Sequence, residues 1–314
     1  MFSVVLPAYN SERFIDKAIE SVLMQTYTDF ELIIVDDGST DGTRQRIASY
    51  TDKRIRCVYQ ENGGVSAARN KGILESKGDF VCFLDSDDSW KTDHLAEMDA
   101  LIQKFGHCGL FITGYDLRLN NGEIVPKSKQ ILKRISEEQS MSENGFDVLN
   151  KNGYFFNTNT MCCKREVFQK VGLFEVGVKN GEDDDLWYRI FAYYPIAISK
   201  KATTVYDRAN CGATATRLEV TEPYFMRRVE GLLNSPEVLP TRKEGLRVWV
   251  ERNKLSRARQ NILQGRKAEA FKLLRTVSFR KSDKKRYFEA VFCLLIPTKL
   301  VRKRIDQRDA GYYN

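Results

Sequence analysis

The sequence predicts an α/β fold, in which a Rossmann-like, mostly parallel β-sheet is flanked by helices and followed by a basic helical appendage. Short apolar runs alternate with amphipathic helical patterns over the first 115 residues. The runs are apolar at almost every position, which is typical of parallel strands that are covered on both faces. A chain of 314 residues, of which 42% are hydrophobic, is long enough to bury such a sheet.

The individual elements follow in order from local patterns. Apolar runs, each ended by polar or turn-forming residues, predict strands at 2–6, 32–35, 55–59, 80–84 and 110–115. Apolar residues at helical spacing predict helices at 14–23, 42–50, 65–73 and 92–104. Residues 116–153 are polar and are expected to be irregular, with a turn at Asn120-Asn121-Gly122. Further along, the pattern predicts a strand and a short helix over 158–174, a helix from Glu182 and an extended segment over 196–206.

The charge is divided unevenly along the chain. The whole sequence has 50 basic and 42 acidic residues, a formal net charge of +8, but residues 1–220 carry −5 and residues 221–314 carry +13. This asymmetry predicts two regions with different roles. In the basic region, two amphipathic helices are expected at 241–264 and 266–277, with Gly265 as the hinge, and an apolar stretch over 287–304 ends in Lys and Arg residues.

Composition argues against several classes of protein. Only two histidines are present, His94 and His107, which argues against a His-rich zinc site and against a Ser-His-Asp hydrolase. The longest apolar run, Ala290–Ile296, is far shorter than the ~20 residues that a membrane-spanning helix needs. The N-terminus has no basic and apolar signal segment, and the seven cysteines form no C-x-x-C pair. We therefore expect a cytoplasmic protein.

Polar clusters follow three of the predicted strands directly. They are Pro7-x-Tyr9-Asn10, Asp36-Asp37-Gly38-Ser39 and Asp85-Ser86-Asp87-Asp88. In an open parallel sheet, ligands bind beyond the carboxyl ends of the strands, so these clusters are expected to meet at one edge. Five neighbouring carboxylates would repel one another without a counterion. A divalent cation with oxygen ligands, Mg²⁺ or Mn²⁺ shared with substrate phosphates, would supply one.

These clusters allow other interpretations. The acidic residues are also consistent with a solvated loop, and Asp36-Asp37 with an ordinary turn before a helix. The pair Asp85 and Asp87 would equally suit a phosphoryl-transfer enzyme, either a phosphatase or a nucleotidyltransferase. The haloacid-dehalogenase type of phosphatase fits weakly, because it favours Thr or Val where this chain has Ser89. Gly63-Gly64 could bind a phosphate at a helix start or simply cap that helix.

Five segments in order resemble the motifs of family 2 glycosyltransferases. They are Val4–Asn10, Ile34–Asp41, Gly63–Asn70, Phe83–Asp88, and Glu182-Asp183 followed by Leu186-Trp187 and Arg189. The resemblance is strong over 1–115, looser over 155–215 and absent beyond about 220. It implies the GT-A fold, a nucleotide-sugar donor, a divalent metal and inversion at the anomeric carbon. It also implies a catalytic domain over 1–220, with a donor part at 1–115 and an acceptor part at 116–220, and a basic helical region over 221–314.

The resemblance assigns roles position by position. It implies donor contacts from Pro7, Tyr9, Asp36, Asp37, Gly64, Arg69, Asp85 and Arg208. Asp87, with Asp85, would hold Mn²⁺ or Mg²⁺. Asp183 would be the general base, with Glu182 beside it in the motif. Some members have a C-terminal histidine as a further metal ligand, but this chain has none after His107, so diphosphate oxygens and water would complete the shell.

The resemblance therefore implies an inverting glycosyltransferase of the bacterial cell-surface polysaccharide type. Its donor would be a nucleotide-sugar, a UDP-sugar above all, and its acceptor a glycan or lipid-linked precursor. The basic segment 241–304 is expected either to pack as helices or to contact an anionic membrane at the inner face of the plasma membrane. Nucleic acid is not an expected partner, because no nucleic-acid motif accompanies the charge. A non-catalytic, membrane-bound nucleotide-sugar-binding module remains an alternative.

Overall fold

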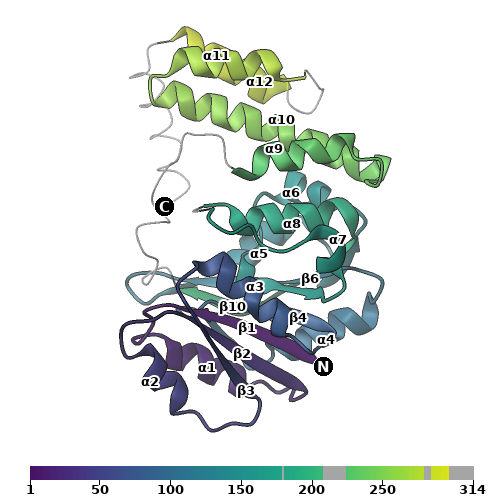
Figure 1. Cartoon of the computed structure of the whole chain (residues 1–314). Helices are drawn as coiled ribbons and strands as arrows, with labels where there is room; N and C mark the ends of the chain where they lie inside the picture. The colour runs from purple at the N-terminus through teal and green to yellow at the C-terminus, as the bar shows by residue number, and fades with distance from the viewer. Residues whose placement is uncertain (179, 208–223, 279–283, 297–314) are drawn as a thin grey trace. The chain divides into compact units, whose positions relative to one another are not determined.

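The computed structural model describes residues 1–178, 180–207, 224–278 and 284–296 (Figure 1). The chain divides into two compact units. The first comprises residues 1–217 and 223–245, and the second comprises residues 218–222 and 246–314. Contacts therefore divide the chain near residue 245, whereas the functional boundary at residue 220 stays a prediction.

The first unit is built around a parallel sheet at its N-terminal side. Four strands lie in the order β3-β2-β1-β4, with bounds β1 (Phe2–Ala8), β2 (Phe30–Asp37), β3 (Ile55–Gln60) and β4 (Phe80–Phe83). All three pairings between them are parallel, and Phe2 lies opposite both Phe30 and Phe80. The intervening helices are α1 (Ile15–Leu23), α2 (Thr43–Ala48), α3 (Val65–Glu75) and α4 (His94–Lys104). The predicted strands and helices of this region are confirmed.

Beyond β4 the sheet becomes mixed. The order continues β9-β6-β10-β5, with bounds β5 (Ser89–Trp90), β6 (Leu110–Arg118), β9 (Met161–Lys164) and β10 (Ile196–Asp207). Strand β9 pairs antiparallel with both β4 and β6, while β10 is parallel to β6. The predicted fold class is confirmed, and the antiparallel pairs that β9 makes with β4 and β6 and that β5 makes with β10 were not predicted.

Helices cover both faces of the sheet. One core contains Val4, Leu6 and Ile34 together with Ile15 of α1 and Met98 of α4. Strand residues alternate between the two faces, so Ile33 and Val35 face the other way and meet Ala68 of α3. Helix α3 lies very close to β1 at Gly72. A Cβ added at this position would come within 2.3 Å of Val5 Cγ1, so only glycine fits there.

Residues 116–153 are more regular than predicted. They form β7 (Ile124–Val125), α5 (Lys127–Ile131), a 3-10 turn (Leu132–Arg134), β8 (Gln139–Ser142) and α6 (Gly145–Asn152). The expectation of an irregular segment was wrong, because these short elements depend on contacts with distant residues. The ring of Phe146 in α6, for example, lies 5.8 Å from that of Phe191. The expected turn is present, with Gly122 at φ +84°.

The remaining elements of the first unit come from the part of the chain that follows α6. Its elements are a 3-10 turn (Thr158–Thr160), α7 (Val167–Val171), α8 (Glu182–Tyr193), α9 (Tyr224–Gly231), a second 3-10 turn (Leu232–Asn234) and the start of α10 (Pro240–Leu263). Helix α8 is anchored by Trp187, which is fully buried and lies 5.7 Å from the ring of Phe83 in β4. This packing brings the start of α8 to the sheet.

The second unit is helical. Its described parts are the remainder of α10, α11 (Lys267–Thr276) and α12 (Lys284–Leu295). Its core contains Leu255, Ile262, Leu274 and Ala290, and Gly265 takes φ +82° at the hinge between α10 and α11. The two predicted helices and the hinge are confirmed. The segment 297–304 of the predicted apolar stretch lies outside the described residues. Within the described part of the chain, no helix is both long and apolar enough to span a bilayer.

Candidate active site

A cavity of about 580 Å³ opens at the carboxyl ends of β1, β2 and β4. We call it the sheet-edge cavity. It is lined by Pro7, Ala8, Tyr9, Asn10, Ser11, Phe14, Asp37, Asn62, Gly64, Val65, Ala68, Arg69, Asp85, Ser86 and Asp87. Three of the motifs that the sequence analysis placed at strand ends therefore meet here, together with the Gly63-Gly64 segment.

Asp36 and Asp37 hold the loops around this cavity in place. Both are almost fully buried. Asp36 accepts a hydrogen bond from the Ser39 N–H and pairs with Arg44 at 3.3 Å. The Asp37 carboxylate accepts from the Gly63 N–H at 2.9 Å and the Gly64 N–H at 2.8 Å. Gly64 itself takes φ +86°, a conformation that favours glycine. These aspartates thus shape the cavity rim, and their predicted donor contacts stay a prediction.

Arg69 lies at the centre of the charged groups. Only 4% of it is exposed, and it pairs with Asp85 at 2.7 Å and with Glu182 of α8 at 3.6 Å. Its Nε and Nη1 are buried without a hydrogen-bond acceptor among the described residues. Arg69 therefore joins the sheet-edge cavity to the start of α8.

Asp87 and Asp88 are adjacent in sequence but differ in surroundings. Burial, reinforced by the nearby Asp85 charge, raises the pKa of Asp87 to about 6, and no described residue forms an ion pair with it. Asp88 accepts hydrogen bonds from the Asn159 side chain and, at 2.7 Å, from the Asp207 N–H. Protein donors already serve Asp36, Asp37 and Asp88, which leaves Asp85 and Asp87 as the carboxylates that could share the expected cation.

The start of α8 carries a second acidic group, Glu182 to Asp185. Asp183 accepts from the Thr158 hydroxyl at 3.3 Å and from the Asp184 N–H at 2.8 Å. Burial and the Asp183 charge raise the pKa of both Glu182 and Asp184, and Tyr154 donates to Asp184 at 3.1 Å. The first turn of a helix favours carboxylates, which offsets part of the cost of gathering these acidic side chains at the start of α8.

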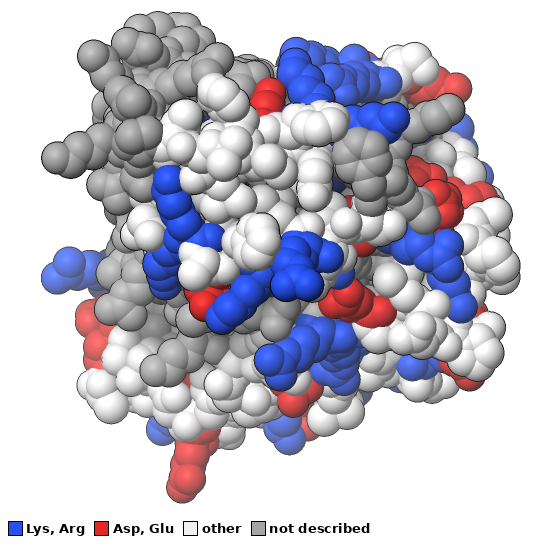
Figure 2. Space-filling model, turned by 90° about the horizontal axis from the view of Figure 1, so that it is seen from above, with Lys and Arg blue, Asp and Glu red and all other residues white. Residues whose placement is uncertain are grey.

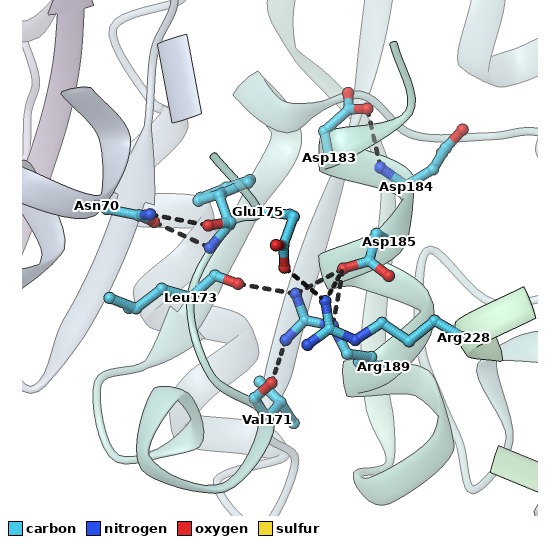
Figure 3. A network of polar contacts seen from close by, with 10 residues as sticks. Asn70, Val171, Leu173, Glu175, Asp183, Asp184, Asp185, Arg189 and Arg228 are labelled. Carbon is cyan, nitrogen blue, oxygen red and sulfur yellow. Dashed lines mark hydrogen bonds and ion pairs between the residues drawn. The ribbon is translucent and has the colours of Figure 1, made fainter. Parts of the chain in front are cut away.

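A network of polar contacts fixes the position of this turn (Figure 3). Asp185 is fully buried and pairs with Arg189 at 2.8 Å. Arg189 also donates to the carbonyl oxygens of Val171 and, at 2.8 Å, Leu173. Arg228 of α9 reaches the same Asp185 carboxylate at 3.3 Å. The network therefore ties α8 to the loop that precedes it and to α9.

Residues 3–172 match the model of the family described as glycosyl transferase family 2, which covers more than half of the chain. The chain belongs to this family. The family resemblance identified from the motifs is thereby confirmed.

Curated relatives match part of the chain. The chain is 41% identical over 131 residues to "Putative teichuronic acid biosynthesis glycosyltransferase TuaG" of Bacillus subtilis (strain 168), covering 40% of this chain and 51% of that protein. It is 37% identical over 128 residues to "UDP-Glc:alpha-D-GlcNAc-diphosphoundecaprenol beta-1,3-glucosyltransferase WfgD" of Escherichia coli, covering 40% and 50%. The chain thus spans about half the length of these relatives.

Solved structures share the fold over nearly the whole chain. A crystal structure of S. aureus TarS 1-349 in complex with UDP-GlcNAc superposes with a TM-score of 0.68 at 21% identity, covering 92% of this chain and 79% of that one. The mannosyltransferase PcManGT from Pyrobaculum calidifontis, in complex with GDP-Man and Mn²⁺, gives a TM-score of 0.55 at 18% identity, covering 95% and 82%. These likenesses confirm the predicted GT-A fold.

The residues fit a divalent metal that is shared with substrate phosphates. No group of three or more His, Cys, Asp or Glu side chains within the described ranges could hold a metal ion, so a cage made of protein alone is not found there. Asp85 and Asp87 offer two carboxylates in the cavity, and Asp87 forms no ion pair within 4.0 Å among the described residues, although the Arg69 charge is near enough to lower its pKa. Mg²⁺-type sites commonly use one or two carboxylates and complete their shell with phosphates and water.

Sequence reasoning missed Asn159. It is 1% exposed, its side-chain oxygen accepts from the Asp85 N–H at 2.7 Å, and its amide donates to Asp88. Its carbonyl oxygen accepts from Trp90 Nε1 at 2.9 Å. A single asparagine 71 residues from Asp88 gave no signal in the sequence, although it organises the whole acidic loop. The predicted donor contact Arg208 lies outside the described residues.

Proposed function

We propose that this family member is an inverting glycosyltransferase that moves a sugar from a nucleotide-diphospho-sugar to a hydroxyl acceptor. The observation that carries the proposal is the Arg69 bridge. Arg69 pairs with Asp85 in the sheet-edge cavity and with Glu182 beside Asp183, so the proposed donor site and the proposed base would adjoin. The family and the fold lend no support to the phosphoryl-transfer or the non-catalytic alternatives.

The sheet-edge cavity would take the donor. TarS, which shares the fold, has been solved with UDP-GlcNAc and with UDP, and this supports a UDP-sugar for this chain. Pro7, Tyr9 and Asp37 would contact the nucleobase end, and Tyr9 is 51% exposed at the rim. Arg69, which lines the cavity, would place its positive charge near the diphosphate.

A divalent cation, Mn²⁺ or Mg²⁺, would be held by Asp87 with Asp85. When bound, it would neutralise the negative charge that develops on the leaving diphosphate. Support comes from the unpaired state of Asp87 among described residues and from PcManGT, which was solved with Mn²⁺.

Asp183 would act as general base. It would accept the proton of the acceptor hydroxyl as that hydroxyl attacks the anomeric carbon opposite the leaving group, and such assistance contributes ~10²–10⁴-fold to rate. Thr158 and the Asp184 N–H hold the Asp183 carboxylate in a defined orientation. The acceptor would be a lipid-linked or surface-polysaccharide precursor, a proposal that the activities named for the relatives WfgD and TuaG support.

The variant Asp183→Asn tests this assignment. Release of nucleotide diphosphate should fall by at least ~10²-fold, because the base is lost. Binding of the nucleotide-sugar, followed by thermal shift, should change little because Asp183 does not line the cavity. Transfer at the wild-type rate in Asp183→Asn would contradict the base assignment.

We also propose that the basic segment 241–304 contacts an anionic membrane at the inner face of the plasma membrane. Helix α12 presents Phe288, Phe292 and Leu295 at 61%, 51% and 79% exposure, with the spacing of one helical face. Residues 246–314 carry 19 basic and 6 acidic side chains. On the face in Figure 2, Lys and Arg side chains gather in several groups. Apolar side chains flanked by cations suit an anionic lipid surface.

Flotation of the full chain with phosphatidylglycerol vesicles tests the membrane proposal. The double variant Phe292→Ser/Leu295→Ser should lose most of the binding, because the apolar contribution to membrane affinity scales with buried area. Leu74→Ser is the control, because Leu74 is also an exposed apolar residue, 71% exposed, but lies in the first unit. This variant should bind the vesicles like wild type. Equal flotation of the double variant and wild type would refute the contact.

A further inference from the structure

Helix α9 contacts the base-bearing end of α8 at two points. Phe225 packs against Tyr188 with ring centroids 5.4 Å apart, and a Cβ added at Gly181 would lie 2.8 Å from the Phe225 ring. Arg228, about one turn further along α9, reaches Asp185 at 3.3 Å. One helix thus touches both the residue that caps α8 and the carboxylate two positions after Asp183.

Asp185 is a buried anion whose partners fix the orientation of α8. It is fully buried, and its pair with Arg189 lies within α8 at i,i+4 spacing. That pair alone cannot tie α8 to its surroundings. The ties come from Arg189, which donates to the Leu173 carbonyl oxygen at 2.8 Å, and from Arg228, which also pairs with Glu175 at 2.9 Å.

The loop over 171–175 is held from its other side by α3 (Figure 3). Asn70 donates to the Phe174 carbonyl oxygen at 2.8 Å and accepts from the Phe174 N–H at 2.9 Å. The neighbouring residue of α3 is Arg69, which pairs with Asp85 in the cavity. A continuous set of contacts therefore runs from the cavity through α3 and this loop to α8 and α9.

We propose that Arg228 is a positioning residue, which bridges Asp185 and Glu175 and thereby holds the first turn of α8, with Asp183, against the sheet-edge cavity. The proposal rests on the proposed role of Asp183 as base. Without Arg228, Asp185 would keep its ion pair with Arg189, and Glu175 would lose its ion pair with Arg228. The first turn of α8 would then be held less firmly to the loop that contains Glu175. Arg228 does not line the cavity, so donor contacts should be unaffected.

The test compares Arg228→Ala, Arg228→Lys and the control Arg46→Ala in the full chain. Arg46 is the control because it is also an exposed arginine and forms its ion pair outside this network, with Asp16 at 3.3 Å. We expect kcat for UDP release from a UDP-sugar to fall on the order of tenfold in Arg228→Ala, because misplacement of a reacting group is costly. Donor KM should change less than twofold, and Arg228→Lys should recover part of the rate. Hydrogen exchange of amides 181–187 should accelerate in Arg228→Ala only.

Two results would overturn the positioning role of Arg228. They are a wild-type kcat in Arg228→Ala, and a raised KM for the nucleotide-sugar with unchanged kcat. If the wild-type chain releases nucleotide from no sugar nucleotide, the proposed function fails, and hydrogen exchange then decides the positioning claim: unchanged exchange at 181–187 refutes it. If Arg228→Ala does not fold, Glu175→Gln removes the exposed partner of Arg228 and carries the same expectations.

Discussion

At the scale of single residues, the carboxylates show how identical side chains take different roles. Asp37 and Asp88 are buried and satisfied by hydrogen bonds, whereas Asp87 lines the cavity, where burial raises its pKa to about 6. The sequence predicted where these aspartates lie because each follows a strand directly. It did not predict their partners, because Asn159 and Asp207 come from distant parts of the chain.

Asp37→Asn should destabilise the chain and weaken binding of the nucleotide-sugar. The Asp37 carboxylate accepts hydrogen bonds from Gln60, Gly63 and Gly64. The amide of asparagine would turn its own N–H group toward some of these N–H groups, so not all of these hydrogen bonds could form. Leaving buried donors unsatisfied costs ~1–3 kcal/mol. Chemical denaturation measures this loss, with the exposed Asp79→Asn as control, which should leave the free energy of unfolding unchanged. Equal stability of the two variants would show that the Asp37 contacts are dispensable.

His94 should make stability depend on pH. Its ring stacks on Trp90 at 3.9 Å, its Nδ1 lies 2.8 Å from the Thr203 hydroxyl, and burial lowers its pKa to about 3. The His94 side chain of the unfolded chain binds a proton near pH 6.5, whereas that of the folded chain does so only near pH 3. The free energy of unfolding is therefore at its full value, as far as His94 is concerned, above about pH 6.5, and it decreases as the pH falls below that value. The loss is at most ~1.4 kcal/mol per pH unit.

Denaturation of wild type and His94→Phe at pH 7, 6 and 5 measures this dependence. The variant should lose less stability than wild type over this range. His107→Gln, in which the exposed histidine is replaced, should follow wild type. Parallel pH profiles of wild type and His94→Phe would contradict the burial of a neutral His94.

At the scale of elements, strands and helices with a strong local pattern were predictable and short elements were not. Strand β1 and helix α1 carry continuous or periodic apolar residues that suffice to identify them. Helix α6 has eight residues and depends on the Phe146–Phe191 contact and on the Asn144 side chain, which accepts from the Phe146 N–H. Local sequence cannot reveal contacts of this kind, because they form only in the folded chain.

Gly181→Ala should be more destabilising than Gly177→Ala. Both glycines have positive φ, +80° and +84°, so either alanine is strained by roughly 1–2 kcal/mol. At Gly181 the new Cβ would also meet the Phe225 ring at 2.8 Å, whereas nothing lies within 4 Å at Gly177. That overlap should add ~1–3 kcal/mol. Thermal or chemical unfolding measures both losses, and similar values would contradict the α8–α9 contact.

At the scale of the whole molecule, the charge division predicted two regions and contacts define two units. The contact boundary lies near residue 245 because α9 and the start of α10 pack within the first unit. Arg242 donates to the Glu143 carbonyl oxygen at 2.7 Å, and Asn144 donates to that of Thr241 at 3.0 Å. The charge count could not place this boundary, because residues 221–245 are electrically balanced and carry the same number of basic and acidic side chains.

The central claim is that the sheet-edge cavity binds a nucleotide-sugar with a divalent cation at Asp87. Thermal shift of the full chain with UDP, UDP-sugars and GDP-sugars, each with and without Mn²⁺, tests it most directly. UDP or a UDP-sugar with Mn²⁺ should raise the melting temperature, and Asp87→Ala should abolish this rise. A chain that no nucleotide stabilises, or an Asp87→Ala variant that responds like wild type, would contradict it.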